Sequence, residues 1–334
     1  MEMRKVQVTG GSSFIITLPK DWINEMGISK NDPLGVVQQV DGTLLIVPGH
    51  RIKTKSRKKD IVLDDIEDGA HLFRLMIGAY VTGYRTIELV SSKRVRPFIR
   101  EKVRDFVQTA IGFEIVDETN RLIVLKDLLD PSQMPFASTI ERMGIIVSDM
   151  HKDCMRSLTK GDRAGLESVI FRDKDVDRLQ WLIARQYTLV LDDVTLAGSM
   201  GVSRRQANAF YLMARTLERI GDHAVRIAEN CMHLLDGVIE DDLMESIKAV
   251  DKDVIEASNK ISGLWRSRDI DGLNRTIDRI KGIERSLDEM DPVASIEGDR
   301  TSMRVGNVIG SIGRVADYTT DLCEIAINHI MLEE

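Results

Sequence analysis

Acidic residues spaced four apart mark one helical segment of this chain. In LERIGDHAVRIAE, residues 217–229, Glu218 and Asp222 lie about 40° apart around a helix, and Glu229 falls on the same line. Like charges at this spacing oppose helix formation by about 0.2–0.5 kcal/mol. The acidic stripe therefore requires either neighbouring cations or a bound metal ion.

Further acidic pairs with the same spacing make a metal site plausible on chemical grounds. Carboxylate oxygens from separate helices can converge on a hard or borderline cation without any change in the backbone. The first candidate set of metal ligands comprises Asp173, Asp177, Glu218 and Asp222. The second set comprises Glu284, Asp288, Asp317 and Asp321, with Gly313 at the position that corresponds to Glu218.

Salt bridges offer a competing explanation of the stripe. Arg215, Arg219 and Arg226 can neutralise it through pairs three or four residues apart, such as Asp222 with Arg226. A di-iron carboxylate enzyme would carry Glu-x-x-His pairs, and the sequence has none. Because no nucleophile or acid–base constellation is present either, the sequence favours a regulatory or binding protein over an enzyme.

The region that must position these carboxylates, residues 133–334, is predicted to be helical nearly throughout. Residues 217–229 superpose without gaps on residues 312–324, so the region contains an internal repeat. Turn and breaker signals leave six main helices, with breaks at Gly161, residues 197–203, Gly237, Asp269 and Pro292. Two tandem three-helix bundles, residues 133–237 and 238–334, are the economical interpretation.

Composition sets the class of protein. The chain is 43% hydrophobic and 30% charged, and it has no apolar run near the roughly 20 residues that span a membrane. We therefore expect a cytoplasmic protein that is not embedded in a membrane.

The three distant cysteines predict buried thiols and not disulfides. Residues 1–59 contain ten Lys and Arg against five Asp and Glu, so a basic head precedes an acidic body and suits a polyanionic partner.

Three smaller segments precede the helical region. Residues 1–50 read as hairpin, short helix and hairpin, with turns at Gly10-Gly11 and Asp41-Gly42. So small a unit rarely has a stable core alone, so we expect pairing with a second copy into a homodimer or a higher homo-oligomer. Residues 51–59 read as a basic linker, and residues 60–132 as a small α/β module.

The segment RKVQVTGGSSFIITLPKDWINEMGISKNDPLGVVQQVDGTLLIVP resembles DNA-binding domains of the AbrB/SpoVT/MazE type. That resemblance implies two chains that swap hairpins into one barrel and bind double-stranded DNA, with Arg4, Lys5 and Lys20 facing the DNA. The linker adds cations suited to phosphate contacts, which carry affinity but little sequence information. These linker residues are Arg51, Lys53, Lys55, Arg57, Lys58 and Lys59.

The segment ARTLERIGDHAVRIAEN resembles the signature of the PhoU family. This resemblance implies tandem three-helix bundles whose acidic motifs hold a transition metal, iron or zinc, and a role in controlling the phosphate ABC transporter. The expected fold is mainly α: PhoU-like bundles preceded by a small swapped-hairpin β domain and a small α/β segment. The combination is similar to archaeal phosphate-uptake regulators.

Two functions follow from these resemblances. The first is a phosphate-responsive transcription regulator of phosphate-uptake genes. The alternative is an accessory protein that contacts the ATPase subunit of the transporter and uses its N-terminal domain for oligomerisation.

Overall fold

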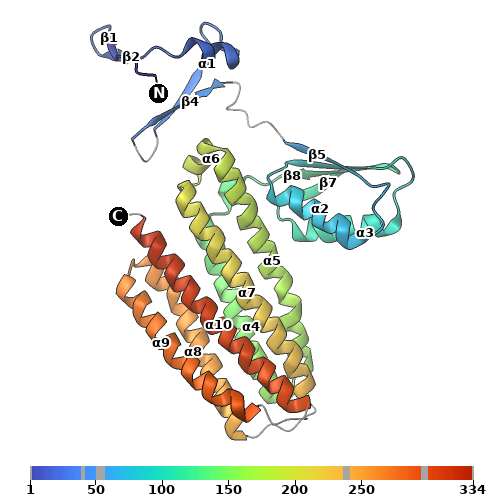
Figure 1. The fold of residues 1–334 in the computed structure, drawn as a ribbon. Helices are drawn as coiled ribbons and strands as arrows, with labels where there is room; N and C mark the ends of the chain where they lie inside the picture. The colour runs from blue at the N-terminus through green and yellow to red at the C-terminus, as the bar shows by residue number, and fades with distance from the viewer. Residues whose placement is uncertain (1, 39–41, 50–56, 236–240, 295–299, 333–334) are drawn as a thin grey trace. The chain divides into compact units, whose positions relative to one another are not determined.

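The chain forms two compact units, residues 1–56 and residues 57–334. The computed structural model describes residues 2–38, 42–49, 57–235, 241–294 and 300–332. Figure 1 shows its helices and strands. Within the described part, no helix is long and apolar enough to cross a membrane.

The first unit has the predicted order of hairpin, helix and hairpin. Its elements are β1 (Gln7–Thr9), β2 (Ser13–Ile15), α1 (Lys20–Glu25), β3 (Leu34–Gln38) and β4 (Leu44–Pro48). Both pairs of strands are antiparallel. Gly10 and Gly11 turn the first hairpin at φ values of 61° and 83°, a region that glycine adopts without strain.

The second unit begins with a two-layer α/β module. Its strands form one sheet in the order β5-β6-β8-β7, in which only β5 and β6 are parallel. Alternate strand residues are buried and form a core with the two helices. The elements are β5 (Lys58–Val62), α2 (Gly69–Val81), β6 (Thr86–Val90), α3 (Pro97–Thr109), β7 (Phe113–Glu118) and β8 (Leu122–Asp127).

Strand β5 is the one element of this module that the sequence analysis missed. The interpretation of residues 51–59 as a linker ends inside the strand, since β5 starts at Lys58. The reason is physical: a basic start with a single buried side chain, Ile61, gives an edge strand little hydrophobic alternation.

Six long helices follow, three in each half, as the repeat predicted (Figure 1). The first half contains α4 (Phe136–Lys160), α5 (Arg163–Asp192) and α7 (Arg204–Leu234), with the short α6 (Val194–Ser199) between the last two. The second half contains α8 (Asp241–Arg266), α9 (Ile270–Ala294) and α10 (Arg300–Met331). Gly161 ends α4 in the left-handed conformation.

The two bundles share one continuous hydrophobic core, and α7 packs along α10. Leu217, Ile220, Ala224 and Ile227 of α7 are all buried in it. The acidic stripe is therefore separate from the core face of α7, as its helical phase predicted.

The α/β module is held to helix α5 by a buried ion pair. Arg185 of α5 is 2% exposed and donates to Asp127 of β8 at 2.6 Å. Its guanidinium also donates to the carbonyl of Tyr80 and lies over the rings of Tyr80 and Phe113. A buried guanidinium needs such partners, so these contacts fix the module to α5.

Candidate functional site

Helices α5 and α7 bring the first candidate set of carboxylates together. Asp173 and Asp177 lie on α5, Glu218 and Asp222 lie on α7, and all four are partly buried. We call these four residues acidic cluster 1. The helices pack closely at Gly221 of α7, where a Cβ would be in ordinary contact with Val176 at 3.5 Å and with the Oδ1 of Asp173 at 3.8 Å.

Mutual repulsion and burial disfavour the charged forms of this cluster. Burial, followed by the charges of Asp173, Glu218 and Asp222, raises the pKa of Asp177 to about 7. Burial and the charge of Asp222 raise the pKa of Asp173 to about 6. Burial also raises the pKa values of Glu218 and Asp222. The charge of Asp222 raises the pKa values of Asp173, Asp177 and Glu218, so the four acids lie within electrostatic reach of one another.

Salt bridges do not neutralise acidic cluster 1 within the described part of the chain. Arg219 instead lies over the ring of Tyr318 of α10, at 5.7 Å from the ring centre. The charges of Arg226 and Arg215 only offset part of the rise in the pKa of Asp222. The buried Oδ1 of Asp173 also lacks a hydrogen-bond partner among the described residues.

The donor set suits a cation, although the side chains are not arranged around one. An unpartnered carboxylate oxygen beside three further carboxyls matches the oxygen-rich ligation of hard and borderline cations. Among the described residues, however, no three His, Cys, Asp or Glu side chains converge closely enough to hold a metal ion. Binding would therefore require rotation of the carboxylate side chains.

The second candidate set is more exposed and partly neutralised. Burial, followed by the charges of Asp317 and Asp288, raises the pKa of Glu284. Asp317 forms an ion pair with Arg314 at 2.9 Å. Asp288 and Asp321 are exposed. We call Glu284, Asp288, Asp317 and Asp321 acidic cluster 2.

A groove of about 540 Å³ opens beside acidic cluster 1, between α5 and the two helices of the α/β module. Asp177, Lys174 and Arg178 line the α5 side, and Phe73 and Lys102 line the module side. This groove gives solutes a route to Asp177. The sequence analysis did not predict this groove, because its walls come from α5 and from the α/β module, and no sequence motif links these segments.

The cations predicted to contact DNA fall into three groups. Arg4, Lys5 and Lys20 are exposed in the first unit, and Arg4 is paired with Glu2. Arg51, Lys53 and Lys55 lie outside the described residues. The others belong to the second unit: Arg57 and Lys58 have acidic partners there, and Lys59 is exposed in β5.

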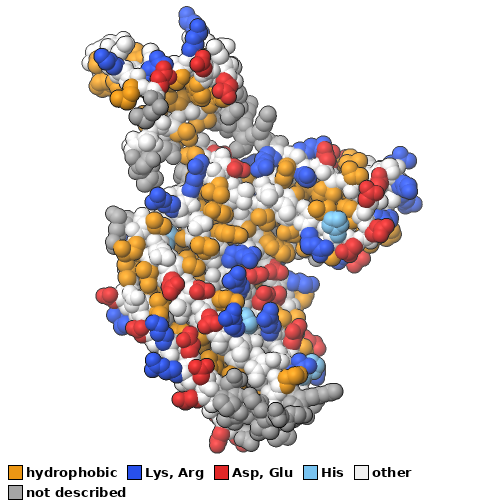
Figure 2. Space-filling view, in the orientation of Figure 1, with side chains coloured by type: hydrophobic (Ala, Val, Ile, Leu, Met, Phe, Trp, Pro, Cys, Tyr) orange, Lys and Arg blue, Asp and Glu red, His pale blue; other side chains and the backbone are white. Residues whose placement is uncertain are grey.

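The side of the second unit that faces the viewer in Figure 2 lacks the charge pattern of a DNA-binding face. Figure 2 shows acidic and basic side chains interleaved over the visible side of the helical bundles. Lys58 pairs with Glu88 at 2.8 Å and with Asp60 at 3.3 Å. A continuous basic patch is the usual electrostatic footprint of a DNA-binding surface, and the visible side of the bundles lacks one.

A buried polar pair between the two halves also escaped the sequence analysis. His151 of α4 is fully buried, with its Nδ1 3.4 Å from Asp251 of α8 and its Nε2 3.2 Å from the carbonyl of Ile220. The surrounding helical pattern gave no signal, because a single His and a single Asp on different helices form no spacing motif. The pair joins α4 to α8 and α7, so it belongs to the packing of the halves.

Comparison with known proteins agrees with the two-part organisation. The PhoU domain model matches residues 140–231, and the model for the antidote-toxin recognition protein MazE, a bacterial antitoxin, matches residues 7–57. The chain is 24% identical over 211 residues to a phosphate-specific transport system accessory protein PhoU homolog of Clostridium acetobutylicum. That match covers 57% of this chain and 88% of the relative.

Two solved structures share the helical fold. PhoU from Pseudomonas aeruginosa superposes with a TM-score of 0.53 at 17% identity, over 59% of this chain and 95% of that one. The phosphate transport system regulatory protein PhoU from Streptococcus pneumoniae gives a TM-score of 0.50 at 16% identity, over 60% and 94%. Both matches confirm the predicted helical bundle architecture.

Proposed function

We propose that this chain, which carries a PhoU domain behind a MazE-like N-terminal domain, is a phosphate-responsive transcription regulator of phosphate-uptake genes. It binds double-stranded DNA through the first unit, and it acts in the cytoplasm. The observation that carries the proposal is the pairing of these two domains in one chain. A MazE-like unit gives the PhoU domain a way to reach genes as well as a transporter.

The first unit acts as a dimer in this proposal. Its strands leave large apolar side chains exposed, including Phe14 at 75%, Leu44 at 65% and Val8 at 64%. Contiguous exposed apolar surface of this kind marks an interaction site. Hairpins exchanged with a second copy would bury these side chains and place two sets of Arg4, Lys5 and Lys20 on one DNA duplex.

Acidic cluster 1 binds a transition metal, iron or zinc, in the proposed mechanism. Asp173, Asp177, Glu218 and Asp222 would hold it, and its charge would offset their repulsion and cross-link α5 to α7. The role of the chain's own residues is to position these carboxylates and keep them partly shielded from water. The proposal includes no catalytic step, in keeping with the regulatory and accessory names of the PhoU relatives.

The second candidate function is that of an accessory protein that contacts the ATPase subunit of a phosphate ABC transporter. The name of the Clostridium acetobutylicum relative, a phosphate-specific transport system accessory protein, favours it. In this case the first unit would serve only for oligomerisation. The two functions differ in one property, which is binding of the first unit to DNA.

DNA binding by the full chain tests the proposal. We expect Lys5→Glu and Lys20→Glu each to weaken binding to duplex DNA and to lower the slope of log affinity against log salt by about one per lost phosphate contact. Lys30→Glu is the matched control, since it changes the same charge elsewhere on the exposed surface of the unit. Absence of wild-type DNA binding, with no occupancy of phosphate-uptake genes in phosphate-starved or phosphate-rich cells, would favour the accessory function.

A further inference from the structure

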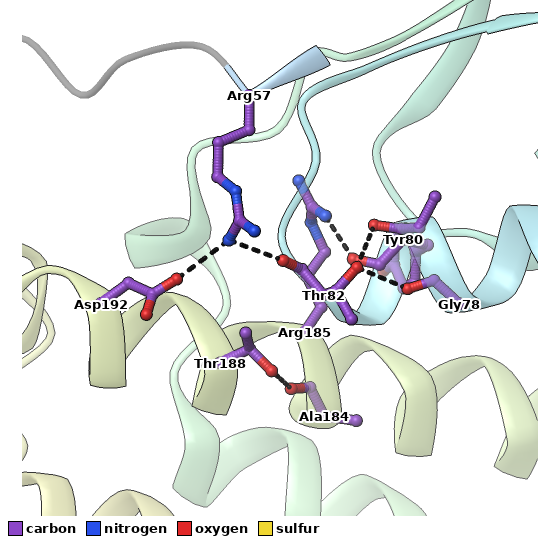
Figure 3. Close-up of polar contacts among 9 residues, drawn as sticks. Arg57, Gly78, Tyr80, Thr82, Ala184, Arg185, Thr188 and Asp192 are labelled. Carbon is purple, nitrogen blue, oxygen red and sulfur yellow. Dashed lines mark hydrogen bonds and ion pairs between the residues drawn. The ribbon is translucent and has the colours of Figure 1, made fainter. Parts of the chain in front are cut away.

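Arg57, the first residue of the second unit, is held by three partners. Its Nη1 donates to the carbonyl of Thr82 and to the Oδ2 of Asp192, both at 3.1 Å (Figure 3). Its guanidinium lies 4.9 Å from the centre of the Tyr84 ring. Asp192 is the last residue of α5, so the side chain of Arg57 joins the end of that helix to the α/β module.

The backbone around this contact is also fixed. The carbonyl of Arg57 accepts hydrogen bonds from the amides of Arg85 at 2.8 Å and Thr86 at 3.3 Å. Gly83 lets its loop approach α5: its φ is 84°, and a Cβ there would lie 3.1 Å from Leu189. The chain therefore enters the second unit at a point that is bonded on both sides.

Two turns earlier along α5, Arg185 makes the buried contacts that fix the module (Figure 3). Arg57 and Arg185 together hold the module at two points about 10 Å apart along one helix. Two separated contacts prevent rotation about either one. A movement of α5 would consequently be passed to the point where the chain arrives from the first unit.

The energetics indicate that Arg57 has a geometric role. Its side chain is 48% exposed and that of Asp192 is 59% exposed, and ion pairs this exposed contribute little to stability. Buried Arg185 and the apolar core of the module supply the stronger attachment. The negative charge of Asp192 beside the guanidinium also offsets its attraction to a DNA phosphate.

We propose that Arg57 is a positioning residue and not a DNA contact: it fixes the entry of the chain into the second unit to the end of α5. This inference rests on the proposed function, in which the first unit binds DNA. With the entry point fixed, the chain that leads from the first unit reaches the second unit at one defined place. Specific binding, which needs both units in register, therefore depends on Arg57, whereas non-specific binding does not.

The variants Arg57→Gln and Asp192→Asn distinguish a positioning role of Arg57 from a phosphate contact. The two roles predict opposite changes in DNA affinity for Asp192→Asn. The DNA probes are duplexes that the wild-type chain selects from a random pool. If Arg57 positions the units, both variants weaken binding to these duplexes severalfold and leave the slope of log affinity against log salt unchanged. If Arg57 contacts phosphate, Arg57→Gln lowers the slope by about one, and Asp192→Asn releases the cation and tightens binding. Lys59→Gln is the comparison variant: it removes a neighbouring exposed cation that has no anchoring role, so it lowers the salt slope if Lys59 contacts phosphate and leaves the anchor intact.

A second measurement needs no DNA. Hydrogen exchange at the Arg85 amide, which bonds the Arg57 carbonyl, should become faster in both variants and stay unchanged in Lys59→Gln. Unchanged exchange in both variants, or tighter DNA binding by Asp192→Asn, would overturn the inference. If the wild-type chain binds no DNA, the proposed function fails and the positioning role fails with it, while exchange still reports whether Arg57 anchors the chain.

Discussion

The two acidic clusters occupy corresponding helices of the two bundles, yet their environments differ. In acidic cluster 1, burial raises the pKa values of all four carboxyls, and the charges of neighbouring acids raise those of Asp173, Asp177 and Glu218 further. In acidic cluster 2, Asp317 is neutralised by Arg314 and two members are exposed. Carboxyls that are concentrated and shielded from water favour binding of a proton or a cation, whereas carboxylates that are paired or solvated do not.

The repeat shows how the difference arose from a few positions. When the halves are superposed, Gly313 replaces Glu218 and Asp321 replaces Arg226. A looser match of residues 164–177 with residues 271–284 places Ile280, which is fully buried, where the first half has Asp173. The second half thus keeps the helices and loses much of the ligand set. The PhoU domain model, which matches residues 140–231, likewise covers only the first half.

The largest expected effect is on bound metal. Replacing Glu218 and Asp222 together by Ala should remove most of the iron or zinc from protein purified without chelator, as measured by elemental analysis. Helix α7 should remain folded, because Ala is a strong helix former and the two side chains lie outside the core.

The matched control is the double variant Asp317→Ala and Asp321→Ala, which changes two acids of the corresponding helix in acidic cluster 2. It should retain the metal content of the wild-type chain. Equal losses from the two double variants would make the clusters equivalent. A metal-free wild-type chain would show that acidic cluster 1 tolerates its repulsion without a cation.

The second effect is on coupling to DNA. Asp177 and Asp192 lie on the same helix, about 22 Å apart along its axis, so a change at acidic cluster 1 has a direct path to the Arg57 contact. We expect zinc or ferrous iron to change the DNA affinity of the wild-type chain severalfold, a coupling free energy of about 1–3 kcal/mol.

The Glu218→Ala, Asp222→Ala variant should lose this response in a DNA-binding titration, and the variant of acidic cluster 2 should keep it. A response that survives in the first variant would place the metal effect elsewhere. Loss of the response in both variants would indicate that the second bundle also takes part.

The sequence predicted the elements better than it predicted the environments. Helical periodicity and the repeat located the long helices, because each pattern is local to its own segment. The strand at Lys58 was missed, since an edge strand needs little hydrophobic alternation. The sequence analysis also placed Arg57 among the linker cations suited to DNA phosphates, and its partner Asp192 lies 135 residues away. Such partners are set by tertiary packing, which spacing alone does not report.

The third effect is a pH dependence of stability that belongs to acidic cluster 1. A carboxyl with a raised folded-state pKa binds more protons in the folded than in the unfolded state, so its contribution to stability is present at low pH and lost as pH rises. With pKa values of about 6 for Asp173 and about 7 for Asp177, metal-free protein should lose stability between about pH 4 and pH 7.

Asp177→Asn should therefore stabilise the metal-free chain at pH 7.5 by about 1–2 kcal/mol, after allowance for partial exposure. Urea unfolding with a chelator present measures the change. Asp288→Asn is the matched control, since it alters an exposed acid of acidic cluster 2. Stabilisation of the same size in both variants would mean that general surface charge, and not the shared site, sets the pH dependence.

The smallest expected effect on stability comes from rebuilding acidic cluster 2. Gly313→Glu restores the carboxyl that the repeat lacks, and the site has room, since a Cβ there would meet only Leu287 at 3.8 Å. The change from Gly gains about 0.5–1 kcal/mol of helix propensity, and repulsion from Asp317 offsets about 0.2–0.5 kcal/mol of it. Net stability should consequently change by less than about 1 kcal/mol.

Metal content is the informative measurement for this variant. If the missing carboxyl limits acidic cluster 2, Gly313→Glu should bind more zinc than the wild-type chain in equilibrium dialysis, through Glu284, Asp317 and the new side chain. Gly282→Glu is the matched control, because it adds the same charge to an open position on another face of α9. No gain over this control would mean that one carboxyl is insufficient, and that the buried Ile280 and the Arg314 ion pair hold the second half in a state without a metal.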